Sequence, residues 1–397
     1  MLRRIVPALG VIALASPAAM SQEIAKGLFL DGWIDTIFTV TDSQYESADT
    51  SANNSAAFSS NAKVKIAWNV TDQVTGKIGV KFNNKVSSTT TTTTARDLDD
   101  DGAQDIDPDT GLPLFDSSSS SSSGSDAYLQ EAFFSANVGN GFNVTAGKFI
   151  SYVGLQSAEP TGLFRVGYTP TVKLYTSDVI GASVGYSNDV LSGAVYILNG
   201  NGLTDAVDSN NSANPSLTNV SQTLGYGIDL TYNLPEKMGN VNLEVAWDPA
   251  NEATGSDIYQ VGLNATVKPA EKTTVLAEVI YRGTVDGAIN DGKSDTKEDI
   301  AWMLLANQVV ATEGIPASVT GSVGQLTPGY STDGEVDKTL SEVAVAVLTN
   351  PFGSSAFGLN LEVAYAWYDG TKGTNIVDGE PVDGGTTVSL EGLIVIP

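Results

Sequence analysis

Strict alternation of apolar and polar residues over windows of about ten residues limits most strongly how this chain can fold. The clearest window lies near the end of the sequence, where apolar residues occupy every second position: Phe357, Leu359, Leu361, Val363, Tyr365 and Trp367. The same period recurs within 64–70, 74–82, 224–234, 241–247 and 259–267. A period of two is typical of a β-strand whose two faces contact different surroundings. The pattern therefore predicts an all-β protein.

Two further patterns separate a membrane barrel from a soluble β-sandwich, which also alternates. Several apolar faces end in aromatic residues, as the aromatic belts of membrane barrels do: Trp68, Trp247, Tyr365 and Trp367. The connections between windows also alternate in length, which is typical of short periplasmic turns and long extracellular loops. We therefore expect a transmembrane antiparallel β-barrel of about 16 strands (roughly 14 to 18), formed by residues 22–397 as one domain.

The first 21 residues resemble a cleaved export signal. Arg3 and Arg4 precede an apolar stretch over 5–15, and small residues suited to cleavage follow it. The apolar stretch is much shorter than the roughly 20 residues that a membrane-spanning helix needs. We predict a signal peptide over 1–21 and, together with the barrel pattern, a location in a bacterial outer membrane.

Composition excludes several classes of function. The chain has no histidine and no cysteine, so a Ser-His-Asp triad, an HExxH zinc site and a thiol nucleophile are absent. It carries 46 acidic against 20 basic residues, for a net charge of −26, which argues against nucleic acid as a partner. We expect a protein that is not an enzyme and requires no cofactor.

If the apolar positions face lipid, the intervening side chains point into the barrel. This register places four lysines on two adjacent strands and mainly acidic groups elsewhere, and we predict that they line a pore: Lys63, Lys65, Lys77, Lys81, Asp229, Glu244, Asp248, Glu278, Arg282 and Glu362. About 16 strands enclose a lumen too wide for side chains alone to fill, which favours a water-filled channel. The alternative is a narrower barrel that is plugged.

The long loop over 150–171 differs from the other long loops, because it is rich in aromatic, apolar, Gly and Pro residues. A loop of this kind is unsuited to solvent. We predict that it folds into the lumen and narrows the pore, with Glu159 and Arg165 as constriction charges. The alternative is a loop packed at the rim or in a subunit interface. The strand that follows it is expected over 172–187.

The acidic and Ser/Thr-rich loop over 87–125 contains the strongest local motif. Carboxylates spaced as in a calcium-binding loop precede and follow Gly102: Asp97, Asp99, Asp101 and Asp105. Position 12 of the motif is Pro108 instead of the usual Glu, so Asp107 or Asp109 would have to substitute. The segment 97–109 either binds Ca²⁺ or is an acidic, solvated loop. Loops of this kind are also suited to divalent ions that bridge lipopolysaccharide phosphates.

A short stretch of sequence resembles a known family. The run from Gly147 to Gly154 (GKFISYVG), followed by Glu159 and Pro160, is similar to the Gly-Lys-Phe segment of the OmpL-like β-barrel porins. The later run 198–202 (LNGNG) is similar to the Asn-Gly strand end of that family. The resemblance covers about residues 125–205 and implies a channel-forming porin of the outer membrane. The C-terminal residues LIVIP depart from the aromatic ending that is usual for such barrels.

These observations favour an outer-membrane porin for passive diffusion of small hydrophilic solutes and ions, with a mild preference for cations. Its expected partners are outer-membrane lipid, lipopolysaccharide and its solutes, and a homotrimer is expected by analogy with porins. One alternative is a non-conducting surface barrel that displays adhesive or structural loops, with or without calcium. A soluble, exported binding protein is a third class, which the alternating connection lengths disfavour.

Overall fold

The structure is a computed structural model of the 397-residue chain. It describes residues 22–45, 54–95, 115–150, 154–156, 159–175, 178–199, 224–249, 256–286, 295–329, 339–351, 356–369, 376–377 and 380–396. The predicted signal peptide over 1–21 and the predicted calcium ligands Asp97, Asp99, Asp101 and Asp105 lie outside these residues.

Sixteen strands form a closed antiparallel barrel in the part of the chain that the structure describes, as the alternation predicted. In chain order they are β2 (Leu28–Tyr45), β3 (Asn54–Asn69), β4 (Val74–Ala95), β5 (Phe115–Gly139), β6 (Phe142–Ile150), β7 (Asp178–Ser187), β8 (Leu191–Asn199), β9 (Leu224–Asn233), β10 (Gly239–Asp248), β11 (Ser256–Ala270), β12 (Thr273–Asp286), β13 (Asp295–Ala311), β14 (Ala317–Thr327), β15 (Thr339–Thr349), β16 (Phe357–Asp369) and β18 (Glu380–Ile396). Each strand pairs with the next, and β18 closes the ring by pairing with β2. Short β1 (Gln22–Ala25) pairs with β2, and β17 (Ile376–Val377) pairs with β18.

Side-chain exposure follows the predicted register. On β9 and β10 the burial alternates residue by residue, with Leu230 and Val245 exposed and Asp229 and Glu244 buried. Exposed apolar side chains cover the outside of most other strands as well. Aromatic pairs lie on this outer face, among them Tyr226 stacked on Trp247 with ring centres 6.1 Å apart. The barrel is thus apolar outside and polar inside. None of the helices in the described residues is long and apolar enough to span a membrane.

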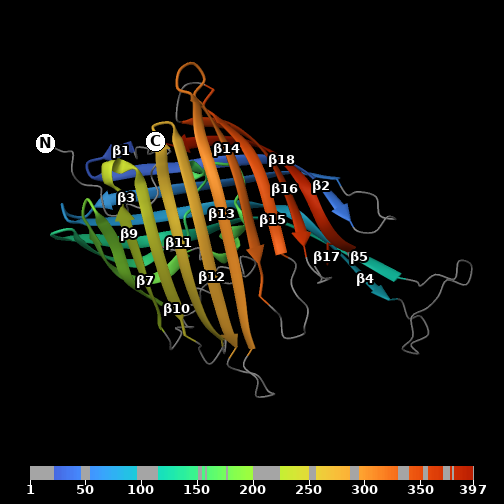
Figure 1. Ribbon diagram of the computed structural model, residues 1–397, viewed down its shortest axis with the longest axis horizontal. Helices are drawn as coiled ribbons and strands as arrows, with labels where there is room; N and C mark the ends of the chain where they lie inside the picture. Colours follow the sequence, from blue (N-terminus) through green and yellow to red (C-terminus); the bar gives the residue numbers. More distant parts are fainter. Residues whose placement is uncertain are drawn as a thin grey trace, which may run out of the picture.

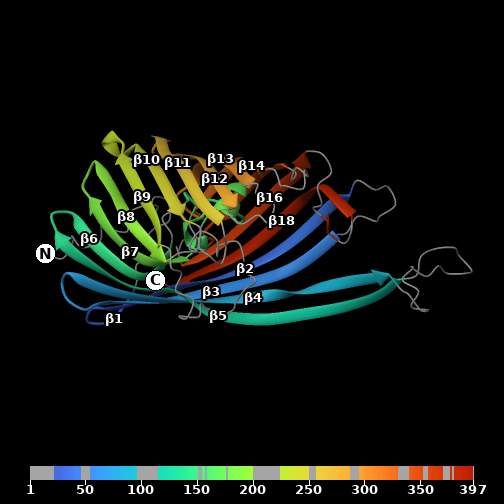
Figure 2. The same cartoon turned by 90° about the horizontal axis from the view of Figure 1, so that it is seen from below.

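The two ends of the barrel differ in their connections (Figures 1 and 2). At one end the turns are short, and the β5–β6 turn needs only Asn140 and Gly141 between its strands. Gly139, Asn140 and Gly141 all have positive φ there (94°, 53° and 83°), which glycine and asparagine adopt most readily. The strand ends that precede and follow the longer connections lie at the other end, as expected for a transmembrane β-barrel.

The structure corrects two predicted boundaries. The loop expected over 87–125 is shorter, because β4 continues to Ala95 and β5 begins at Phe115, and the two strands pair through Thr and Ser runs. Figure 2 shows this hairpin extending past the neighbouring strands. Threonine is β-branched and favours strands, but uniform Ser and Thr runs carry no alternation that would predict them. The strand expected over 172–187 begins at Asp178, since η2 (Pro170–Leu174) occupies its first residues.

The long connection between β6 and β7 enters the barrel (Figure 2). It carries two short 3₁₀ helices, η1 (Pro160–Gly162) and η2. Leu155 packs against inward-facing apolar side chains of β12 and β13, with Phe164 beside it: Leu276, Met303 and Leu305. Leu174 packs against Ile280 and Ala301. We call residues 154–175 of this connection, where described, the inner loop.

Candidate pore constriction

The first attachment of the inner loop is to the lysines of β3. The Glu159 carboxylate accepts from Lys63 Nζ at 2.7 Å and from Lys65 Nζ at 2.9 Å. Lys63 also lies 2.5 Å from Glu131 of β5, and Lys65 lies 2.9 Å from Asp31 of β2. Lys63 is fully buried, and the carboxylates of Glu131 and Glu159 are its ion-pair partners. Lys63 and Lys65, both predicted to line the pore, are thereby paired with Glu159, a predicted constriction charge.

Glu159 is held ionised by this arrangement. Burial by itself would raise the pKa of its carboxyl, but the positive charges of Lys65 and Lys63 and their hydrogen bonds outweigh burial. The resulting pKa is about 2, against an ordinary value of 4.5. The ion pairs that fasten this side of the inner loop therefore persist over the whole neutral and mildly acidic range.

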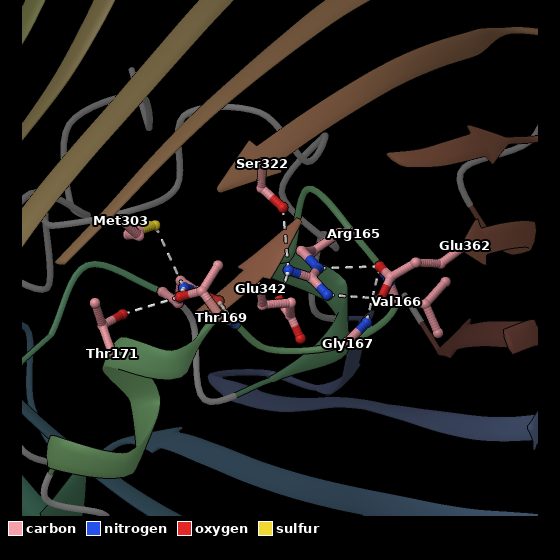
Figure 3. A network of polar contacts seen from close by, with 10 residues as sticks. Arg165, Val166, Gly167, Thr169, Thr171, Met303, Ser322, Glu342 and Glu362 are labelled. Atoms are coloured by element: carbon pink, nitrogen blue, oxygen red, sulfur yellow. Dashed lines mark hydrogen bonds and ion pairs between the residues drawn. The ribbon is translucent and has the colours of Figure 1, made fainter. Parts of the chain in front are cut away.

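The second attachment is to β14–β16, which connect to β3 around the ring through β18 and β2. Arg165 donates to both carboxylate oxygens of Glu362 on β16, at 3.1 Å from Nε and 2.8 Å from Nη2. Its Nη1 donates to Glu342 of β15 at 2.6 Å and to Ser322 of β14 at 3.1 Å. Figure 3 shows the guanidinium between these side chains. A bidentate pair of this kind fixes both position and orientation.

Backbone groups of the inner loop complete the Arg165 site. The N–H groups of Val166 and Gly167 donate to Glu362 Oε2 at 2.9 and 3.1 Å (Figure 3). Burial would lower the pKa of the Arg165 guanidinium, but its hydrogen bonds and the charges of Glu362 and Glu342 raise it. Glu362 therefore accepts four hydrogen bonds from three consecutive residues of the inner loop.

The third attachment uses acidic side chains of β10 and β12. Glu244 accepts from the N–H of Gly154 at 2.9 Å, and Glu278 accepts from the N–H of Leu155 at 2.7 Å. The Tyr175 hydroxyl donates to Glu278 and accepts from the N–H of Leu155 at 3.0 Å. Burial and then the charge of Glu278 raise the pKa of Tyr175, so its hydroxyl stays protonated and able to donate.

A row of polar side chains continues from this attachment across β9 to β11. Asn242 donates to Asp229 at 2.7 Å, and Asn264 donates to Asn242 and Glu244, both at 3.0 Å. The row is buried and lies on the inner face. Within the described part of the chain, no basic side chain pairs with Asp229, Glu244 or Glu278.

The remaining predicted pore residues also lie on the inner face. Lys77 pairs with Glu131 at 3.0 Å and lies over the Phe133 ring. Lys81 stands opposite Lys63 in the register. Asp248 is buried on β10, and Arg282 of β12 stands opposite Asp299 of β13, whose charge acts on it. Whether these groups line an open path stays a prediction.

Sequence reasoning missed Glu131 and Glu342 as partners. Glu131 lies beside a β-bulge in β5, where Leu129 pairs with Val80 and Glu131 pairs with Gly79. The extra residue, Gln130, turns both polar side chains inward and breaks the period of two. The sequence around 126–138 contains no clean alternation from which that direction follows. Glu342 does follow the alternation of β15, but its role depends on the path of the inner loop.

The Gly-Lys-Phe run has a structural basis. Gly147 has a φ of 130°, and a Cβ there would collide with the backbone of Ala132 and Phe133 on β5. Lys148 donates to the carbonyl of Leu129 at 2.8 Å. Phe149 is buried with Phe133 in an apolar cluster on the inner face. These residues lead the chain from β6 into the inner loop.

Comparison with solved structures reveals porins of the same architecture. The channel DcaP of Acinetobacter baumannii superposes with a TM-score of 0.59 at 12% identity, covering 95% of this chain and 99% of DcaP. The anion-selective porin from Comamonas acidovorans gives 0.58 at 11% identity, covering 93% and 99%. OprB of Pseudomonas putida gives 0.56 at 11% identity, covering 92% and 94%. The chain therefore has the fold of a porin barrel.

No protein-family model matches the sequence, and no curated protein matches it. At these identities the likeness to solved structures concerns the fold alone. The similarity to OmpL-like porins rests on the residues quoted for it.

Proposed function

We propose that the protein is an outer-membrane porin through which small hydrophilic solutes and ions diffuse passively, and that the inner loop sets the width of its pore. The observation that carries the proposal is the three-sided attachment of the inner loop inside a barrel that is apolar outside. Glu159 fastens it to β3, Gly154 and Leu155 fasten it to β10 and β12, and Arg165 fastens it to β14–β16. A segment held in this way narrows the lumen without needing any further gate.

A mild preference for cations is part of this proposal. The inner face of β9–β12 carries Asp229, Glu244 and Glu278, whose described partners are amide, hydroxyl and backbone N–H groups. The described lysines of β3 and β4 are largely engaged by Glu131, Glu159 and Asp31. A wall of uncompensated carboxylates raises the local concentration of cations. The likeness to an anion-selective porin argues the opposite way, but it concerns the fold.

Export by the signal peptide over 1–21, contact with lipid and lipopolysaccharide, and assembly as a homotrimer belong to the same proposal. Aromatic side chains at the ends of the outer face, such as Trp247, suit a membrane interface. Calcium binding within 97–109 stays a separate proposal.

Single-channel recording in a planar bilayer, with a salt gradient, tests the proposed function. Wild-type protein is expected to give discrete steps and a reversal potential of cation sign. Deleting residues 156–166 removes the Glu159 and Arg165 attachments and is expected to raise the conductance. Unchanged conductance after this deletion would rule out the constriction, and a folded barrel that never conducts would rule out the porin.

A non-conducting display barrel is the second candidate. The observation in its favour is the β4–β5 hairpin, which continues through Thr–Ser pairs beyond the paired part of β3. The absence of conductance, together with full heat-modifiability on gels, would favour this candidate.

A further inference from the structure

A group of hydrogen-bond acceptors lies on the inner face of β9–β11, away from the Glu159 and Arg165 attachments. Its acidic members are Asp229 and Glu244, which stand directly opposite each other in the register of β9 and β10. Like charges in opposite positions on a sheet repel, so this pair is destabilising unless a cation or a shared proton compensates it. None of the described residues supplies that cation by an ion pair.

Hydrogen bonds fix the direction of the asparagines beside this pair. Asn264 Nδ2 donates to Glu244 and to Asn242 Oδ1, while Asn242 Nδ2 donates to Asp229. Carboxylates accept only, so both asparagines must turn their NH₂ groups toward them. Asn264 Oδ1 is consequently left as a buried acceptor without a described partner.

Gln260 gives an independent indication of a ligand. It lies on the same inner face of β11 as Gly262, two residues away. The Glu244 carboxylate lies directly over Gly262: a Cβ added there would be 2.9 Å from Glu244 Oε2. The Gln260 side chain is 1% exposed, yet neither its Oε1 nor its Nε2 has a hydrogen-bond partner among the described residues. A buried amide with no partner is destabilising, so a group from outside the chain is expected to satisfy it.

The other neighbours of Gln260 agree with a positively charged ligand. Arg282 stands opposite Gln260 on β12, but Asp299 of β13 stands opposite Arg282 and offsets its charge. On the other side, the Tyr196 ring packs on Gly227, two residues from Asp229, and presents an aromatic surface to the same wall.

From this arrangement we propose a binding site for a small organic cation with several N–H donors and one acceptor, such as a primary ammonium compound carrying a hydroxyl group. Its three N–H groups would donate to Asp229, Glu244 and Asn264 Oδ1, and its hydroxyl would donate to Gln260 Oε1 and accept the Gln260 Nε2 hydrogen. A metal ion fits less well, because the described residues contain no group of three His, Cys, Asp or Glu side chains that could hold one. The site rests on the proposed channel and names a class of solute for it.

Calorimetric titration of the whole, detergent-purified protein with ethanolammonium tests the site. Tetramethylammonium has the same charge but no N–H donor, so it is the matched control ligand. We expect ethanolammonium to bind at least tenfold more tightly. Gln260→Leu and the isosteric Asp229→Asn should each weaken its binding about tenfold. Asn307→Leu is the control variant, since Asn307 is an inward amide that already donates to Thr320 at 2.8 Å.

Equal affinity for the two cations, or unchanged ethanolammonium binding in both site variants, would overturn the site. Heat-modifiability of each variant verifies that its barrel is folded, and Asp229→Asn alone decides the matter if Gln260→Leu fails to fold. Bilayer recording separates this inference from the proposed function. Protein that binds ethanolammonium but never conducts would refute the channel and leave the site, whereas a conducting channel that does not distinguish the two cations refutes the site alone.

Discussion

Replacing Arg165 with methionine tests the constriction most directly, because it removes one charge while keeping an unbranched side chain of similar length. Glu362 would lose its bidentate partner and remain buried with only the N–H groups of Val166 and Gly167 as described partners. Removing one member of a buried ion pair costs about 3–5 kcal/mol. The two remaining donors favour the lower value, about 3 kcal/mol, which corresponds to a roughly hundredfold larger population of the detached inner loop.

Hydrogen exchange and conductance measure this population independently. The amides of Val166 and Gly167 are expected to exchange roughly a hundredfold faster in Arg165→Met, since they exchange when the inner loop leaves Glu362. Single-channel conductance should rise and become noisier. Lys173→Met is the matched control, because Lys173 is an exposed residue of the same loop that makes no ion pair within the described residues.

A double variant sharpens the result. Adding Glu362→Gln removes the uncompensated carboxylate, so Arg165→Met combined with Glu362→Gln should cost less than the sum of the single changes. If Arg165→Met and Lys173→Met give the same exchange rates and the same conductance, the Arg165–Glu362 ion pair does not hold the constriction.

Three further outcomes follow from the structure. Folding lowers the pKa of the Glu159 carboxyl from 4.5 to about 2, so this attachment should stabilise the inner loop by about 3 kcal/mol above pH 4.5. The stabilisation is lost as the pH falls from 4.5 toward 2, and the conductance should rise over the same range. Gly147→Ala should destabilise the barrel by at least about 1–3 kcal/mol in thermal unfolding, because φ is 130° and β5 blocks the Cβ. Val363→Arg, on the lipid-facing side of β16, should cost about 2–4 kcal/mol.

Each of these outcomes has its own control. Glu159→Gln should abolish the change of conductance between pH 4.5 and 2. If the conductance of this variant still changes over that range, other carboxyl groups are responsible. Gly321→Ala meets no atom within 4 Å and should be nearly neutral; equal losses at Gly147 and Gly321 would contradict the steric explanation. Val363→Ile should be tolerated, and an arginine tolerated equally well would mean that this face does not contact lipid.

The barrel was predictable because lipid and water impose opposite requirements on alternate residues. That requirement extends to the inward position of Asp229 and Glu244, which stand between exposed apolar neighbours. The alternation breaks down where protein, and not water, covers the inner face of the barrel. In β13, Ala301, Met303 and Leu305 face inward and are apolar because the inner loop packs on this part of the wall, so both faces of the strand are apolar.

The partners of the constriction charges were not predictable in the same way. An alternating pattern states which face a side chain occupies, but it does not state which of several inward carboxylates a loop residue reaches. Arg165 reaches Glu362 and Glu342 because the inner loop crosses from β3 to β16, and that path depends on packing by Leu155 and Leu174. The acidic motif over 97–109 matched a local pattern and lies outside the described residues.

The attachments of the inner loop also impose an order on assembly. Arg165 and Glu362 are 197 residues apart in the chain, whereas Glu159 and Lys63 are 96 apart. The β3 attachment needs only the first third of the strands, but the β16 attachment has no partner until the last hairpins have been added. A barrel caught before β16 joins would hold its inner loop at β3, β10 and β12 but not through Arg165. The proposed constriction would therefore be completed only by the last step of barrel assembly, and an unfinished barrel would be expected to leak more than a finished one.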